Sequence, residues 1–149
     1  MALVALEARV ETVTPTGERR SFPVESLHRL PGETPHLETD LTPGELITGV
    51  VLPPPDGGQV YRKVRDRASF AGGLASVAVA GARVALGAVA PGPWRAARAE
   101  AALGDGASPE EAMTAELAAA VDRGRNGYKI ALVARLGAAA LAVAKGARP

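Results

Sequence analysis

The sequence predicts an α+β protein in which a partial antiparallel β region precedes a three-stranded antiparallel sheet packed with three C-terminal helices. Three observations predict this class. Residues 8–90 contain short runs of alternating apolar and polar residues bounded by proline and glycine, as in strands and turns. Residues 94–145 are rich in alanine and show helical spacing. The second half places its strands before its helices, which favours helices covering one face of an antiparallel sheet.

The composition narrows the class of protein. The chain has 149 residues, which is enough for a buried core, and a net charge of +1 with both signs mixed along the sequence. Binding to nucleic acid or to a membrane surface needs a segregated basic excess, so we expect neither as a partner. The absence of cysteine excludes disulfides, thiolate-bound metals and cysteine-ligated iron–sulfur clusters on this chain, and it suits a reducing compartment.

Neither end of the sequence has the pattern of a targeting or membrane segment. The first ten residues have no basic stretch and reach Glu7 early, unlike a signal peptide. The apolar C-terminal run is interrupted by Lys129, Arg135 and Lys145, so it lacks the purity of a membrane span. We therefore expect a soluble, cytoplasmic protein.

The first region is predicted to form a β-hairpin. Residues 8–14 alternate so that Val10 and Thr12 share one face, and PTGE supplies the turn into the second strand, RRSFPV. Residues 1–6 are either the end of a helix or an extension of the first strand. Residues 24–32 are expected to form a short helical turn.

The middle of the chain contains the predicted boundary between two regions. Residues 32–44 are expected to form an irregular polar connection. ELITGVVL then alternates as a strand, and three prolines followed by DGG end it. We therefore divide the chain into regions 1–58 and 59–149.

The second region is predicted to open with three strands. In the first strand, Tyr61, Lys63 and Arg65 share one face. The opposite face is expected to carry Val60, Arg62, Val64 and Asp66. Residues 74–80 and 83–90 follow as two strands of small residues, joined by a two-residue turn.

Three helices are predicted after these strands. The first extends from Trp94 to Gly104, and the only tryptophan of the chain is expected to fill the corner between sheet and helix. The second begins at a capping box formed by Ser108 and Glu111 and extends to about Asp122.

The third helix is predicted between Gly127 and Lys145, with Asn126 as its N-cap. Its apolar stripe is expected to comprise Tyr128, Leu132, Leu136 and Ala140. The three helices together are expected to cover one face of the antiparallel sheet.

No motif in the sequence predicts a catalytic site. His28 and His36 lie near acidic residues, but their spacing matches no zinc signature, so an exposed polar loop is favoured over a metal site. The serines lack the G-x-S-x-G context of a hydrolase nucleophile. The glycine pairs at 57–58 and 72–73 lack the spacing of phosphate-binding loops and are expected to be turns.

The face that carries Tyr61, Lys63 and Arg65 leaves two interpretations open. Cations beside an aromatic ring can bind phosphate oxygens or the negative edge of a flavin or nucleotide. Charges on an edge strand also protect it against aggregation, and periodicity alone favours this second interpretation.

Five blocks of the sequence resemble one protein family in the same order. They are GELITGVVLP, YRKVRDRASFA, SVAVA, ARVALGAVAPGPWRAARAEAALG and NGYKIALVARLGAAAL. With them the chain resembles the FAD-binding (medium) subunit of the xanthine dehydrogenase and carbon monoxide dehydrogenase family of molybdenum hydroxylases. The resemblance implies that residues 1–58 are the C-terminal remnant of the FAD-binding domain and that residues 59–149 form the subunit's C-terminal domain.

The resemblance also implies a redox function. Such a subunit is an oxidoreductase component that holds FAD and passes electrons from iron–sulfur clusters to an external acceptor. Molybdopterin and the 2Fe-2S clusters are expected only on partner subunits, namely a molybdopterin-binding large subunit and an iron–sulfur small subunit. Ile47 takes the place of an aliphatic residue near the isoalloxazine, and Lys63 takes the place of a lysine near the flavin ring, where an ammonium can stabilise reduced flavin. No catalytic residue is implied in this chain.

Two departures from the family affect these expectations. The family's glycine-rich loops for the FAD pyrophosphate belong to an N-terminal half that the 149 residues do not include, so we expect an incomplete FAD site that needs a complementary chain. The alternative is a non-catalytic truncated or interaction domain that docks on partner subunits without flavin. Without that N-terminal half, we expect residues 1–6 to expose apolar surface and residues 8–14 to form an unpaired strand edge. Both features would favour a homo-oligomer. The second departure is the short hairpin between residues 74–80 and 83–90.

Overall fold

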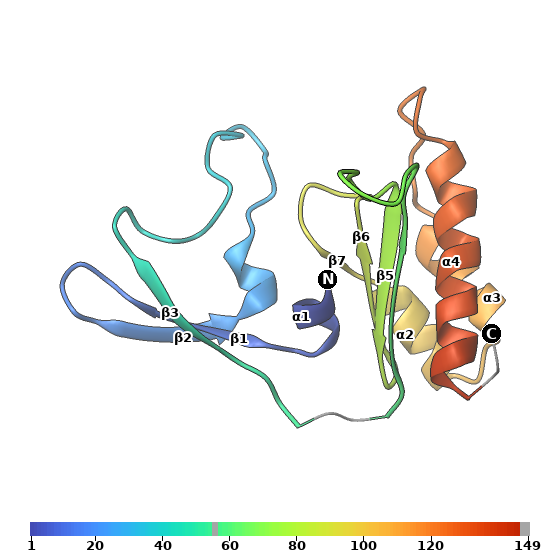
Figure 1. Cartoon of the computed structure of the whole chain (residues 1–149), viewed down its shortest axis with the longest axis horizontal. Coiled ribbons are helices and arrows are strands. Elements are labelled where there is room, and N and C mark those ends of the chain that lie inside the picture. Colours follow the sequence, from blue (N-terminus) through green and yellow to red (C-terminus); the bar gives the residue numbers. More distant parts are fainter. Residues whose placement is uncertain (55–56, 147–149) are drawn as a thin grey trace.

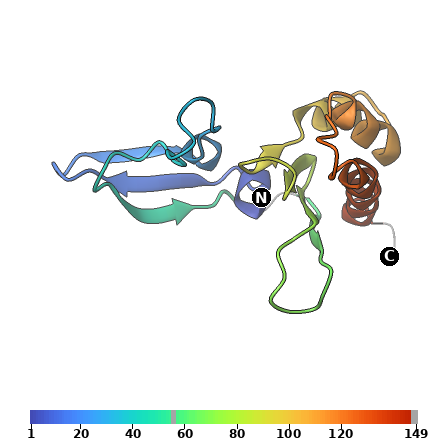
Figure 2. The same ribbon diagram turned by 90° about the horizontal axis from the view of Figure 1, so that it is seen from above.

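The computed structural model describes residues 1–54 and 57–146, and it contains two antiparallel sheets (Figure 1). The first sheet has the order β2-β1-β3 and the second has the order β4-β5-β6-β7. A short helix, α1, lies between the sheets, and three helices cover the far face of the second sheet (Figures 1 and 2). The structure is therefore the α+β arrangement that the sequence predicts.

The first sheet confirms the predicted hairpin. Its elements are β1 (Arg9–Val13), β2 (Arg19–Pro23) and β3 (Leu46–Val51), with the 3-10 helix η1 (Val24–Leu27) after the hairpin. Val10 and Thr12 are buried on one face of β1, as the alternation predicts. The register of β1 against β3 shifts between Glu11 and Thr12, which indicates a β-bulge.

The first residues form a helix and not an extension of the strand. Helix α1 (Ala2–Ala5) is followed by Glu7 in the left-handed region, with φ of 53°. This conformation reverses the chain between α1 and β1. As a result, Val4 and Ala5 are buried against the second sheet.

The second sheet has one strand more than the three predicted. Its elements are β4 (Gln59–Val64), β5 (Ala75–Ala80), β6 (Arg83–Gly87) and β7 (Trp94–Arg95). The turn between β5 and β6 uses Gly81, whose φ of 59° suits glycine. Strand β6 ends at Gly87 and not at residue 90, because the next residue, Ala88, has a φ of 63°.

Residues 94–95 were expected to begin a helix but form β7. Trp94 pairs with Leu86 and Arg95 pairs with Ala85, so both backbones extend the sheet. Helix α2 (Ala97–Gly104) begins only after this pairing ends. The prediction of a helix from Trp94 is therefore wrong by three residues, because sheet pairing prevails over local helical propensity.

Helix α3 (Pro109–Leu117) confirms the predicted capping box. The Ser108 hydroxyl accepts a hydrogen bond from the Glu111 backbone N–H at 3.2 Å, and a Glu111 carboxylate oxygen accepts one from the Ser108 backbone N–H at 2.9 Å. The helix ends at Leu117, five residues before the predicted end. Residues 118–127 lead into the last helix.

Helix α4 (Tyr128–Ala144) begins and packs differently from the prediction. Its N-cap is Gly127 and not Asn126, because the Asn126 side chain accepts a hydrogen bond from the Arg123 backbone N–H at 2.7 Å. The buried stripe consists of Val133, Gly137, Ala138, Ala140 and Leu141. Of the predicted stripe, Ala140 is buried, Leu132 and Leu136 are partly buried at its margin, and Tyr128 is exposed. No helix in residues 1–54 and 57–146 is long and apolar enough to span a membrane.

Two apolar cores explain why every side chain of β5 is buried. The larger core lies between the second sheet and the helices, and it includes Val77, Leu86, Met113 and Leu141. The smaller core lies on the opposite face of the sheet and joins residues from both predicted regions. It consists of Val4, Ala5, Ala8, Val10, Val24, Ala78, Ala80 and Ala85.

The smaller core connects the two sheets through α1. Residues on both sides of the predicted boundary therefore share one set of contacts. Residues 55–56, which belong to that boundary, and residues 147–149 lie outside the described residues. The division of the chain at 58/59 remains a prediction.

Candidate functional site

Lys63 and Tyr61 lie on the face of the second sheet that packs against α1. Residues paired directly across antiparallel strands project to the same face. Tyr61 pairs with Ala78 and Lys63 pairs with Ser76. Because Ala78 belongs to the smaller core, this face is turned toward the first sheet. Tyr61 is nevertheless 54% exposed, and Lys63 is also exposed.

The segment after β4 lies beside Lys63. A Cβ built on Gly73 would lie 3.1 Å from Lys63 Cε, so the lysine side chain passes over this glycine. Phe70 has a φ of 49° and is 95% exposed, while its carbonyl accepts hydrogen bonds from the Arg67 guanidinium. The segment after β4 thus exposes the Phe70 side chain to solvent. Strand β4 ends at Val64, so the expected position of Arg65 and Asp66 on alternating strand faces is wrong.

Ile47 lies on β3, a strand whose apolar side chains are exposed to solvent. Val50 pairs with Val10 and Ile47 pairs with Thr12, so both share the face that carries the buried residues of β1. Leu46 and Val51 lie on the opposite face. These four side chains are all exposed, as is that of Leu52 just beyond the strand, and Ile47 itself is 43% exposed. Strand β3 is also an edge of its sheet.

The two predicted flavin residues therefore lie on different sheets. Ile47 belongs to the first sheet and Lys63 to the second. Each residue lies on the face of its sheet that contributes to the smaller core. These are the two faces through which the sheets contact each other. Within the part of the chain that the structure describes, no hydrogen bond joins these two residues. Their role beside a flavin stays a prediction.

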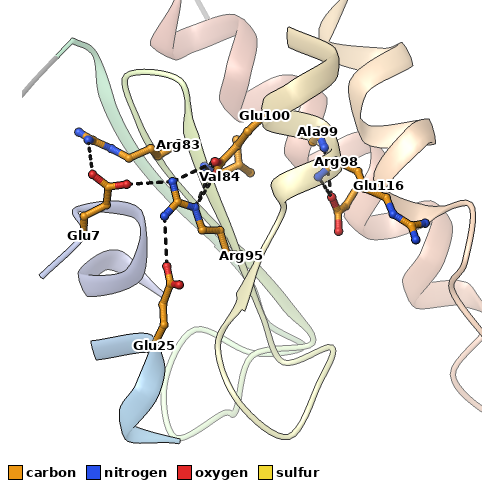
Figure 3. A network of polar contacts seen from close by, with 9 residues as sticks. All are labelled: Glu7, Glu25, Arg83, Val84, Arg95, Arg98, Ala99, Glu100 and Glu116. Atoms are coloured by element: carbon orange, nitrogen blue, oxygen red, sulfur yellow. Dashed lines mark hydrogen bonds and ion pairs between the residues drawn. The ribbon is translucent and has the colours of Figure 1, made fainter. Parts of the chain in front are cut away.

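A polar network fixes the two sheets relative to each other, and the sequence did not predict it (Figure 3). Arg95 of β7 reaches Glu7 at 2.9 Å, Glu25 at 3.4 Å and Glu100 at 3.0 Å. Arg83 of β6 also contacts Glu7, at 2.8 Å. The hydrogen bond from Arg95 is the main reason why the pKa of Glu7 is lowered. The pKa of Arg95 is raised, chiefly by its hydrogen bond to Glu100.

A second carboxylate fixes the start of β3, close to Ile47. The Glu45 side chain has no exposed surface, and it accepts hydrogen bonds from the Thr12 hydroxyl, the Thr42 backbone N–H and the Arg20 guanidinium. These donors, with the Thr12 hydroxyl first, lower the pKa of Glu45 to about 2. The carboxylate thus holds the strand that presents Ile47.

The glycine pair at 57–58 serves close packing. A Cβ on Gly57 would lie 2.9 Å from Gly81 Cα, and a Cβ on Gly58 would overlap the Ala144 carbonyl oxygen. The backbone N–H of Gly81 is also bonded to the Gly58 carbonyl at 3.0 Å. These contacts join the start of β4 to the turn after β5 and to the end of α4.

His28 and His36 lie near acidic residues in the sequence, and the structure places His28 at the end of η1. His28 forms an isolated bridge with Thr39, which belongs to the polar connection. No group of three or more His, Asp or Glu side chains within residues 1–54 and 57–146 is placed to hold a metal ion.

Comparison with solved structures defines the class of fold. The structure of quinoline 2-oxidoreductase from Pseudomonas putida 86 matches 95% of this chain and 53% of that chain, with a TM-score of 0.75 and 20% sequence identity. This likeness concerns the fold alone. Both sheets and the helical cover therefore follow the architecture of a chain from an oxidoreductase.

Comparison with curated proteins identifies a particular relative. The aldehyde oxidoreductase FAD-binding subunit PaoB of Escherichia coli (strain K12) is 46% identical over 151 residues, which cover 97% of this chain and 47% of the relative. No family model matches the chain. The chain spans about half the length of the proteins it matches. The predicted resemblance to an FAD-binding subunit is thus confirmed over the matched residues.

Proposed function

We propose that this chain is part of an FAD-binding subunit of a molybdenum hydroxylase and carries the ring end of the flavin site. In the proposed complex, electrons pass from iron–sulfur clusters through FAD to an acceptor. Two facts support this function: the 46% identity to an FAD-binding subunit over nearly the whole chain, and the likeness to an oxidoreductase fold.

The exposed strand β3 is the observation that carries the proposal. Apolar side chains are exposed on both of its faces, and its outer edge has no partner strand among the described residues. A protein rarely leaves a contiguous apolar surface of this kind in water unless another molecule covers it. We infer that a flavin-binding polypeptide, from this gene or from another, lies against β3.

The described residues fit one end of FAD better than the other. An exposed aliphatic side chain at Ile47 and an exposed ammonium at Lys63 suit the edge of an isoalloxazine ring, which carries negative charge when reduced. The glycine pair at 57–58 is occupied by packing against Gly81 and Ala144 and offers no cradle for a pyrophosphate. In the proposed assembly, these residues hold the ring, and the covering polypeptide binds the phosphates.

The proposal also names the partners. Molybdopterin and 2Fe-2S clusters would reside on a large and a small partner subunit, since this chain has no cysteine to ligate a cluster. The flavin bound here would accept electrons from them and deliver them onward. Substrate oxidation would take place on the large subunit.

Hydrogen exchange tests whether β3 is the covered surface. The chain is mixed with the portion of PaoB that lies outside the matched region, in the presence of FAD, and the amide exchange of residues 46–51 is compared with that of the free chain. We expect slower exchange in β3 and unchanged exchange in α3, which lies on the far side of the second sheet. Exchange in β3 that does not change, although the two polypeptides bind each other, would show that they dock through another surface.

A further inference from the structure

A cavity of about 610 Å³ lies on the helical side of the second sheet. Leu86 and Val133, both part of the larger core, form its buried wall. Lys63 lies on the opposite face of the sheet, so this cavity is separate from the proposed flavin surface. Its volume falls within the range of about 300–1,000 Å³ that is typical of small-molecule sites.

The outer wall of the cavity is apolar and includes the only tryptophan. Trp94 lines the cavity together with Pro91, Val121 and Ile130. The indole N–H of Trp94 donates a hydrogen bond to Glu116 at 2.8 Å, which fixes the ring, yet the residue remains 47% exposed. The sequence predicts that Trp94 fills the corner between sheet and helix, but the exposed part of the residue shows that it fills this corner only in part. A fixed, half-exposed indole beside aliphatic side chains is a suitable contact for a flat apolar ligand.

The charges around the cavity leave a cationic excess. Among the described residues that line the cavity, Glu116 alone is acidic. Its second carboxylate oxygen accepts hydrogen bonds from the backbone N–H groups of Arg98 and Ala99 at 2.9 and 3.1 Å (Figure 3). Its charge is therefore offset by the start of α2.

Three basic residues line the same cavity. They are Arg98, Arg123 and Lys129. The Lys129 ammonium donates a hydrogen bond to the Ala88 carbonyl at 2.8 Å, whereas Arg98 and Arg123 form no ion pair within residues 1–54 and 57–146. Guanidinium groups bind carboxylates through paired, charge-assisted hydrogen bonds. An anion in the cavity would thus find two arginines without an acidic partner.

We propose that this cavity binds a small aromatic carboxylate, with the ring against Trp94 and the carboxylate at Arg98 and Arg123. The apolar wall sets the preference for a ring, and the cationic excess sets the preference for an acid over a neutral molecule. The site does not depend on FAD or on a partner subunit. Its occupancy can therefore be tested without either.

Trp94 provides the signal for the test, because a ligand in the cavity must contact it. The purified full chain is titrated with hydrocinnamate, and tryptophan fluorescence is followed at an excitation wavelength that the ligand does not absorb. We expect a saturable change with a dissociation constant below about 1 mM. Hydrocinnamyl alcohol, which has the same ring and chain without the charge, is expected to bind about tenfold more weakly because it loses a charge-assisted hydrogen bond.

Matched variants locate the binding. The Arg98→Gln and Arg123→Gln variants are each expected to weaken hydrocinnamate binding about tenfold without affecting the alcohol. Arg125→Gln, at an exposed arginine outside the lining, is expected to leave both affinities unchanged. Ala120→Phe, which fills the cavity from an exposed position while keeping both arginines, is expected to abolish binding of either ligand.

Three results would overturn the proposal. They are the absence of a saturable change with the unmodified chain, equal affinities for the acid and the alcohol, and undiminished acid binding by Arg98→Gln, Arg123→Gln or Ala120→Phe. Circular dichroism of each variant confirms that the fold is retained. Because FAD is absent from all of these mixtures, none of the results affects the proposed flavin function.

Discussion

The guanidinium of Arg95 lies 2.9 Å from the carboxylate of Glu7, and this pair joins β7 of the second sheet to the turn between α1 and β1. Glu7 has a positive φ, so its backbone both reverses the chain and directs its side chain to two arginines. The orientation of the first sheet relative to the second therefore depends on contacts between residues more than seventy positions apart.

The Arg95→Gln variant is expected to destabilise the chain by about 1 kcal/mol, because it removes contacts with three carboxylates that are only partly buried. Urea unfolding measures this loss. Arg19→Gln, at an exposed arginine of β2, is the control and is expected to change stability little. Equal stabilities of the two variants would show that the network does not hold the sheets together.

Glu45 predicts a specific dependence of stability on pH. Its pKa is lowered to about 2 in the folded chain from an ordinary value of 4.5, so the unfolded chain binds the proton first as the pH falls. The stabilisation is fully present above about pH 4.5 and is lost as the pH falls toward 2. In urea unfolding, the difference in midpoint between the unmodified chain and Glu45→Gln should narrow over that range. A difference that stays constant would contradict this assignment.

Gly58 is expected to tolerate no side chain. The Cβ of Gly58→Ala would overlap the carbonyl of Ala144, which is backbone and cannot rotate away, so we expect a loss of about 1–3 kcal/mol. Gly72→Ala is the matched control, since no atom lies within 4 Å of its Cβ position. Thermal unfolding of both variants checks the prediction, and similar melting temperatures would show that the start of β4 is free to move away from α4.

Lys63 is expected to raise the reduction potential of a bound flavin. If its ammonium stabilises the negative charge of reduced FAD, Lys63→Gln should lower the midpoint potential by about 30 mV, equivalent to a tenfold change for a two-electron couple. Potentiometric titration of the FAD-loaded assembly measures the shift. Arg62→Gln is the control, because Arg62 pairs with Val77 on the helical face of the sheet. Equal midpoint potentials in the two variants would show that Lys63 does not lie beside the flavin.

Local patterns predicted most of the elements. The hairpin of β1 and β2, the capping box of α3 and the turn at Gly81 all follow from residues close together in the sequence. The misplaced element, β7, depends on pairing with β6. The cap of α4 is shifted because the Asn126 side chain accepts a hydrogen bond from the Arg123 backbone N–H. Local periodicity does not report these contacts.

The proposed sites could be predicted only in part. The resemblance selected Ile47 and Lys63, and the structure adds that Ile47 belongs to a strand exposed on both faces, which composition cannot show. The network of Glu7 and Arg95 and the cavity beside Trp94 were not predicted. Both join residues from distant segments, and no single stretch of sequence carries a signal for them.

FAD titration tests the central proposal most directly. Flavin fluorescence is followed as FAD is added to the chain alone and to the chain mixed with the portion of PaoB outside the matched region. We predict weak or no binding by the chain alone and tight binding by the mixture. A mixture that contains Ile47→Asp, which places a charge at an exposed apolar position of β3, should bind FAD more weakly. Tight FAD binding by the isolated chain, or none by a mixture whose polypeptides associate, would contradict the proposal that this chain supplies only the ring end of a shared flavin site.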